Sequence, residues 1–118
     1  MRKYGIIFIE KRNRFRGEAA MITIIANFKV KDDSISQFKR AALDCVRETR
    51  KEKGNIAYKI YQERNNSGHF TFFEEWLNDT AIDGHNKAVH FKKFLDTIMP
   101  MCEEEPEITQ MSAVPSVY

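Results

Sequence analysis

Alternation of apolar and polar residues is the clearest pattern in this chain, and it predicts β-strands. Side chains two residues apart lie on the same face of a strand, so an apolar residue at every second position indicates a half-buried strand. Four segments have this pattern, and turn-forming residues separate them. The expected strands are Ile22–Val30, Ile56–Glu63, Phe70–Leu77 and Ile108–Val114.

A helical period replaces the alternation between the first two strands. Ser34 and Gln37 fit a capping box at the start of this helix. Gly54 is expected to end it in the left-handed conformation. The charged residues, including Arg50–Lys53, are expected to face water. The buried stripe is predicted to be Ile35, Phe38, Ala42, Cys45 or Val46, and Thr49.

The stretch Phe70–Ile98 begins as the third strand and ends as a second helix. Asp79 is expected to cap the helical segment, and a break is expected between Gly84 and about Val89. Pro100 is expected to terminate it. The apolar stripe at i, i+3, i+4 and i+7 is Phe91, Phe94, Leu95 and Ile98.

The order strand, helix, strand, strand, helix, strand predicts an α+β fold of the ferredoxin-like, split βαβ type (βαββαβ). Two helices cover only one face of a four-stranded sheet. The other face still carries bulky apolar side chains, because Phe70, Phe72 and Trp76 lie on one side of the third strand and Phe73 and Leu77 on the other, so a monomer would leave one set exposed. An apolar surface of that size usually marks an interface, so we expect a homodimer in which two sheets pack face to face.

Charge is unevenly distributed along the 118 residues. Residues 1–20 hold six Lys or Arg against two Glu, whereas residues 21–118 are mildly acidic. The acidic part argues against a nucleic-acid surface, and no window reaches the ~18 continuous apolar residues that a membrane span requires. Residues 1–20 are interpreted as an N-terminal extension, either translated sequence upstream of a start at Met21 or an extra edge strand at Gly5–Glu10.

The two cysteines, Cys45 and Cys102, lie far apart and form no CxxC motif. No secretory signal is recognisable, so both are expected to be free thiols in a cytoplasmic protein. Cys45 falls on the predicted buried helix face and is interpreted as a packed small hydrophobe rather than a nucleophile.

Candidate chemistry concentrates in the stretch after residue 70. Glu74 and Trp76 share one strand face, and burying a glutamate there is costly unless it has a partner. His85 and His90 are about 140° apart on an ideal helix, so they converge only if the helix breaks between them. No i, i+4 pair and no third ligand is evident, so no metal site is expected. A purely structural role, as capping or hydrogen-bonded histidines, stays open.

The same stretch resembles the antibiotic biosynthesis monooxygenase family, including its quinol monooxygenases. The resemblance rests on an E-x-W strand end at Glu74–Trp76, a short acidic turn, and H-x4-H-F at His85, His90 and Phe91. Residues Met21–Val30 and Lys51–Gln62 also resemble the family's first two strands. It covers about residues 21–114, and implies a dimeric α+β barrel that oxidises phenols or quinols with O2 and uses no metal, flavin or haem cofactor.

On this resemblance, residues 21–118 form a cofactor-independent monooxygenase domain whose partners are a second copy, a small aromatic substrate and O2. His85 or His90 is the candidate base, and Asn27 is a candidate holder of an oxyanion. The candidate substrate-binding residues are Trp76, Glu74, Tyr58, Phe72 and Phe91.

Two alternatives stay open. Asn27, Trp76 and His85 also resemble the asparagine, tryptophan and histidine of related haem-degrading monooxygenases. A non-redox role, as an isomerase or a small-molecule-binding protein of the same fold, is the other.

Overall fold

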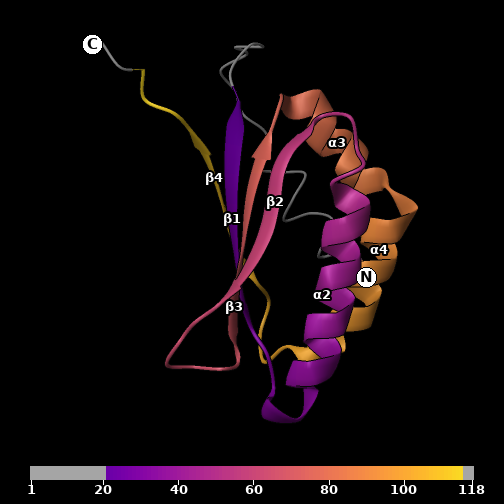
Figure 1. The fold of residues 1–118 in the computed structure, drawn as a ribbon, viewed down its shortest axis with the longest axis vertical. Helices are drawn as coiled ribbons and strands as arrows, with labels where there is room; N and C mark the ends of the chain where they lie inside the picture. The colour runs from indigo at the N-terminus through magenta and orange to yellow at the C-terminus, as the bar shows by residue number, and fades with distance from the viewer. Residues whose placement is uncertain (1–20, 116–118) are drawn as a thin grey trace.

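The computed structural model describes residues 21–115. It contains one four-stranded antiparallel sheet in the order β2-β3-β1-β4 (Figure 1). The expected edge strand at Gly5–Glu10 and the interpretation of residues 1–20 lie outside the described residues. The four strands are β1 (Ile22–Lys29), β2 (Asn55–Gln62), β3 (His69–Trp76) and β4 (Glu107–Ser112), each within two residues of its predicted bounds.

Within residues 21–115, three α-helices pack on one face of this sheet, as Figure 1 shows. The predicted split in the second helical segment is confirmed, because α3 and α4 are separate helices joined at Ala88. Together with the strand order, this confirms the ferredoxin-like α+β fold. The helices are α2 (Ile35–Thr49), α3 (Asp79–Lys87) and α4 (Val89–Ile98), with short 3-10 turns η1 (Asp32–Ser34) and η2 (Met99–Met101).

The helix caps differ from the prediction. Ser34 makes no capping hydrogen bond to α2, because its hydroxyl donates to the neighbouring Asp33 carboxylate instead. Asn78, not Asp79, caps α3, and its Oδ1 accepts the backbone N–H of Ala81 at 2.9 Å. The extended backbone of Asn78 lets its short side chain reach the free N–H groups of the first turn.

Gly54 does not have the left-handed conformation predicted for it, and α2 has already ended at Thr49. The structure gives another reason for a glycine here. A Cβ atom at residue 54 would lie 2.2 Å from the Cβ of Ala81 in α3. The backbone carbonyl of Gly54 also accepts the N–H of Leu77 at 2.9 Å. Gly54 therefore allows the α2–β2 connection to pass directly against α3.

The core lies between the sheet and the three helices. Alternate residues of β1 and β3 point into it, as their sequence pattern predicted. Aromatic rings fill its centre, and Phe38 and Phe94 contact rings from the sheet at centroid distances of 4.8 to 5.8 Å. The most completely buried side chains are Trp76, Tyr58, Phe38, Phe72, Ile22, Ile24, Ile98 and Thr49.

The second face of the sheet carries no helix within residues 21–115 (Figure 1). Ile25 and Phe73 are register partners at its centre and are half-buried. Tyr61 and Met111 lie farther out and are about half exposed.

Among residues 21–115, no helix has the length and apolar character that crossing a membrane requires.

Candidate active site

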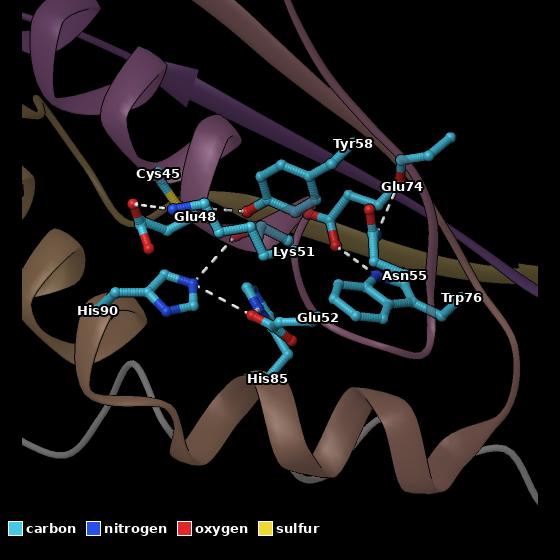
Figure 2. Close-up of polar contacts among 12 residues, drawn as sticks. Cys45, Glu48, Lys51, Glu52, Asn55, Tyr58, Glu74, Trp76, His85 and His90 are labelled. Carbon is cyan, nitrogen blue, oxygen red and sulfur yellow. Dashed lines mark hydrogen bonds and ion pairs between the residues drawn. The ribbon is translucent and has the colours of Figure 1, made fainter.

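The carboxylate of Glu52 joins the two histidines. Its Oε2 lies 2.8 Å from Nδ1 of His85 and 3.1 Å from Nε2 of His90. Figure 2 shows the carboxylate between the two imidazole rings. Glu52 belongs to the turn between α2 and β2, whereas the histidines come from α3 and α4. Three separate elements therefore meet at one carboxylate oxygen.

The break at Ala88 brings the histidines together. Ala88 has an extended backbone, with φ −67° and ψ 140°, between the last residue of α3 and the first residue of α4. The ring centroids of His85 and His90 are consequently only 5.9 Å apart. This confirms the expectation that the pair converges only through a break in the helix.

His85 is held in one orientation. Its side chain is 3% exposed, and the rings of Phe91 and Trp76 lie 4.2 and 4.7 Å away. A carboxylate only accepts hydrogen bonds, so a neutral His85 donates its single N–H from Nδ1 to Glu52. The other nitrogen, Nε2, is buried and has no hydrogen-bond partner among the described residues. Nε2 of His85 therefore has a free lone pair, and the ring that carries it packs against the rings of Trp76 and Phe91.

His90 is the more accessible of the two. Its Nε2 also lies 3.2 Å from Oγ1 of Thr49, and burial lowers the pKa of its imidazole. His90 lines a pocket of about 290 Å³ between α2 and α4. Cys45, from α2, lines the other side of this pocket, and burial raises the pKa of its thiol to about 11. A protonated, buried thiol fits its interpretation as a small hydrophobe rather than a nucleophile.

Glu74 has the partner that its burial requires. The indole N–H of Trp76 donates to Oε1 of Glu74 at 2.9 Å, and both side chains are buried (Figure 2). Burial raises the pKa of Glu74 to about 8, against the lowering effect of the Trp76 hydrogen bond. Its carboxyl group is therefore mostly protonated at pH 7.

The other predicted substrate-binding residues surround the same histidine. Tyr58 lies 5.6 Å from His85 between ring centroids, and its ring contacts that of Phe72 at 5.4 Å. The Tyr58 hydroxyl lies 3.7 Å from Sγ of Cys45, and burial raises its pKa well above the usual range. The structure therefore brings together Tyr58, Phe72, Glu74, Trp76, His85, His90 and Phe91.

Asn27 does not belong to this cluster. It alternates with the buried residues of β1 and so points to the helix-free face of the sheet, away from His85. There its side chain is exposed, and its Oδ1 accepts the hydroxyl of Thr71 at 2.6 Å. An oxyanion held by Asn27 would lie across the sheet from either histidine.

Sequence reasoning missed Glu52 and Asn86. Glu52 was assigned to a solvated helix face, but it lies beyond the end of α2 and its side chain is only 20% exposed. It also supplies the third potential metal ligand that the sequence did not reveal.

Asn86 shares the buried face of α3 with Ile82 and His85, at i, i+3 and i+4. Both polar atoms of its amide are buried without a partner in residues 21–115. The helical spacing from Ile82 was the available signal for Asn86.

The family profile for antibiotic biosynthesis monooxygenases matches residues 21–97, which include every element of the site just described. The chain belongs to the antibiotic biosynthesis monooxygenase family. That assignment confirms the resemblance inferred from the E-x-W and H-x4-H-F motifs.

Two curated relatives are similar to this chain. The Bacillus subtilis protein named "Putative monooxygenase YcnE" is 31% identical over 75 residues, which are 64% of this chain and 79% of that protein. An uncharacterized protein of Synechocystis sp. is 29% identical over 93 residues, which are 79% of this chain. The match spans 63% of the Synechocystis protein, less than two thirds of its length.

Solved structures share the fold along nearly their whole length. A crystal structure of an antibiotic biosynthesis monooxygenase is 29% identical, with a TM-score of 0.77 over 80% of this chain and 99% of that one. A conserved protein from Methanosarcina mazei is 30% identical, with a TM-score of 0.76 over 80% of this chain and 93% of that one.

Proposed function

We propose that this protein is a cofactor-independent monooxygenase that oxidises a small aromatic quinol or phenol with O2. The observation that carries the proposal is the orientation of His85. Glu52 holds the proton on Nδ1 and leaves Nε2 as a free, buried base beside Trp76 and Phe91. The family assignment supports the oxidative reaction, and the site supports the proton transfer that begins it.

In the proposed reaction, Nε2 of His85 removes the proton of the substrate hydroxyl. The phenolate passes one electron to O2, and the two radicals combine at a ring carbon to form a peroxide. The imidazolium returns its proton to the peroxide, and loss of water, with the hydrogen of that carbon, leaves a quinone carbonyl. One oxygen atom of O2 therefore enters the product and the other leaves as water. The Glu52 carboxylate stabilises the imidazolium that forms, as a carboxylate does beside a catalytic histidine.

The aromatic residues suit a flat, apolar substrate. Trp76 and Phe91 flank the imidazole, and Tyr58 and Phe72 continue the apolar surface along the sheet. Such rings favour offset or edge contacts with an aromatic ligand. The protonated Glu74 adds a hydroxyl donor to an otherwise apolar wall, and a donor there suits a ring oxygen of a quinol.

We assign to Asn86 the oxyanion role expected of Asn27. The Asn86 amide lies one residue from His85 on the buried side of α3, and its buried Nδ2 has no partner in the described structure. A buried donor without a partner costs free energy, which a ligand oxygen would offset.

His90 takes a second role, because it connects Glu52 to the pocket between α2 and α4. We assign to His90 the exchange of protons between the buried Glu52–His85 pair and solvent.

We also propose that the protein is a homodimer formed through the helix-free face of the sheet. Ile25 and Phe73 pair at the centre of this face, with Tyr61 and Met111 around them. A second copy presents the same apolar face, so twofold packing buries both at once. Asn27 would then lie in the interface rather than in the catalytic site.

Haem degradation is less well supported than quinol oxidation. That alternative requires Asn27, Trp76 and His85 on one side of the sheet, and Asn27 is on the other. A non-redox proton-transfer enzyme would use the same His85 as the proposed monooxygenase. Consumption of O2 distinguishes the monooxygenase from such an enzyme.

The test is O2 uptake by the purified chain with a panel of reduced quinones, polyphenols and haemin. We expect uptake with at least one quinol or phenol, one oxygen atom from ¹⁸O2 in the product, and no Soret band with haemin. Uptake should be lost in His85→Gln, with an unchanged circular dichroism spectrum. Turnover without O2, or equal uptake by His85→Gln, would contradict the proposal.

A further inference from the structure

We propose that Glu52, His85 and His90 form a binding site for one divalent transition-metal ion of the zinc type. One ligand atom from each residue, namely Oε2, Nδ1 and Nε2, lies within 4.8 Å of the other two. Imidazole nitrogens and a carboxylate oxygen are the donors that zinc takes in proteins when no thiolate is present. This inference does not depend on the proposed oxidation of quinols.

The distances in the cluster match those around a single ion. Two ligands bonded to one ion at about 2.0 to 2.1 Å lie roughly 2.8 to 3.4 Å apart, for angles between octahedral and tetrahedral. The carboxylate oxygen of Glu52 is 2.8 Å from one histidine nitrogen and 3.1 Å from the other. Both oxygen–nitrogen edges are therefore already of the right length. The two histidine nitrogens, which lie within 4.8 Å of each other, would have to be no more than about 3.4 Å apart around the ion.

The charges and the surroundings also suit a cation. A carboxylate and two neutral imidazoles give the site one negative charge. The neighbouring Lys51 pairs with Glu48 at 3.2 Å. His90 opens to the pocket between α2 and α4, which leaves room for water as a fourth ligand and gives the ion a path from solvent.

Metal binding changes where the protons are. An ion bound to Nδ1 of His85 replaces the N–H that now points to Glu52, and a neutral ring then carries its proton on Nε2. The same exchange occurs at His90, where the ion takes Nε2 and the proton moves to Nδ1. No proton is lost from either neutral ring. The metal-bound form has no free base at Nε2 of His85, so metal binding and the proposed proton transfer exclude each other.

The test is calorimetric titration of the chelator-treated full chain with Zn²⁺, followed by titration with Co²⁺ and visible spectroscopy. We expect one Zn²⁺ per chain and a Co²⁺ absorption spectrum of the kind given by low-coordinate nitrogen and oxygen ligands. Glu52→Gln and His90→Ala should each weaken binding by at least about tenfold, because changes that merely misorient ligands already cost 10- to 100-fold. Both variants keep the buried His85 and are checked by circular dichroism.

The chain supplies matched controls. His69 pairs with Glu63 at 3.0 Å, which is another histidine–carboxylate pair but has no second histidine and is more exposed. His69→Ala and Glu63→Gln should bind Zn²⁺ as the unchanged protein does. No binding up to about 1 mM metal, or binding that Glu52→Gln and His90→Ala leave unchanged, would overturn the site. Because the titration contains no substrate, its failure and a failure of quinol oxidation are separate results.

Discussion

Trp76 donates its indole N–H to the carboxyl of Glu74, two residues earlier on the same strand face, at 2.9 Å in the buried core. The hydrogen bond only partly offsets the cost of burial, since the pKa of Glu74 is raised from 4.5 to about 8. The charge of Glu52 acts in the same direction as burial. A single acid group thus links the stability of the core to pH.

The free energy of unfolding should fall between about pH 4.5 and pH 8. In that window the folded chain keeps a proton on Glu74 that the unfolded chain has lost. This stabilisation is complete below the lower value and lost as the pH rises through about 8, by an amount on the order of a few kcal/mol. Glu74→Gln, which is neutral at every pH and still accepts from Trp76, should flatten the dependence. Denaturant titrations at several pH values measure the free energy of unfolding of both proteins. The same dependence on pH in the unchanged protein and in Glu74→Gln would contradict this prediction.

Activity should depend on His85 and on its partner Glu52. His85→Gln should lower kcat by roughly 10² to 10⁴, the usual contribution of a positioned base. A mildly alkaline pH should restore part of the rate by ionising the substrate directly. Glu52→Gln keeps a polar side chain but loses the carboxylate charge, and should lower kcat by at least about tenfold. Glu63→Gln, which removes the same charge from beside the exposed His69, is the matched control. A comparable loss there would show that only overall charge matters.

The two asparagines separate the catalytic face from the open face. Asn86→Ala should lower kcat with a smaller effect on KM, because we place its amide against developing negative charge. Asn27→Ala should leave the rate constant per active site unchanged, since Asn27 lies on the other side of the sheet. Steady-state kinetics on both variants decide this, and the reverse pattern would return the oxyanion role to Asn27.

Gly54 should tolerate no side chain. Gly54→Ala places a methyl group 2.2 Å from the Cβ of Ala81, so α3 must shift, at a cost of about 1 to 3 kcal/mol. Gly84→Ala is the control within α3, where a Cβ meets nothing within 4 Å and should stabilise the helix by about 0.5 to 1 kcal/mol. Thermal unfolding measures both changes. Equal melting temperatures for the two variants would show that the contact at Ala81 relaxes freely.

A charge at the centre of the open sheet face should disrupt the proposed dimer. Phe73→Lys puts an ammonium group beside Ile25 and its equivalents in the second copy. Light scattering should give the mass of a dimer for the unchanged protein and that of a monomer for the variant. Leu43→Lys, on the exposed side of α2, is the control and should remain dimeric. A monomeric unchanged protein at micromolar concentration would contradict the dimer.

The fold was predictable from the sequence because local periodicity controls it. The alternation in β1 and β3 and the helical stripes of α2 and α4 identified most of the residues that the core buries. The break between His85 and His90 was also predictable, from residues that weaken a continuous helix. The capping residues were less predictable. Ser34 matched a capping motif whose hydrogen bond the structure does not make, because a neighbouring carboxylate takes its hydroxyl.

The site was only half predictable, for a physical reason. His85, Glu74 and Trp76 belong to one continuous stretch, whereas Glu52 reaches His85 across 33 sequence positions. No local pattern distinguishes Glu52 from the charged residues around it, since its burial depends on where α3 packs. The alternation of β1 correctly placed Asn27 on the face opposite Ala26 and Phe28. It could not show which of the two faces the helices and their histidines cover, so Asn27 was wrongly grouped with the histidines.

The spacing between the histidines depends on the backbone angles of a single residue. Ala88 is extended although alanine has the strongest intrinsic preference for the helix, so its own side chain does not impose the break. Its N–H instead closes the end of α3 on the carbonyl of His85 at 3.0 Å, and α4 starts without a side-chain cap. The hydrogen bond at this α3–α4 connection is made within the helices and not to the sheet. The separation of His85 from His90 is therefore set by the backbone of the α3–α4 connection and can change while the sheet that carries the fold stays unchanged.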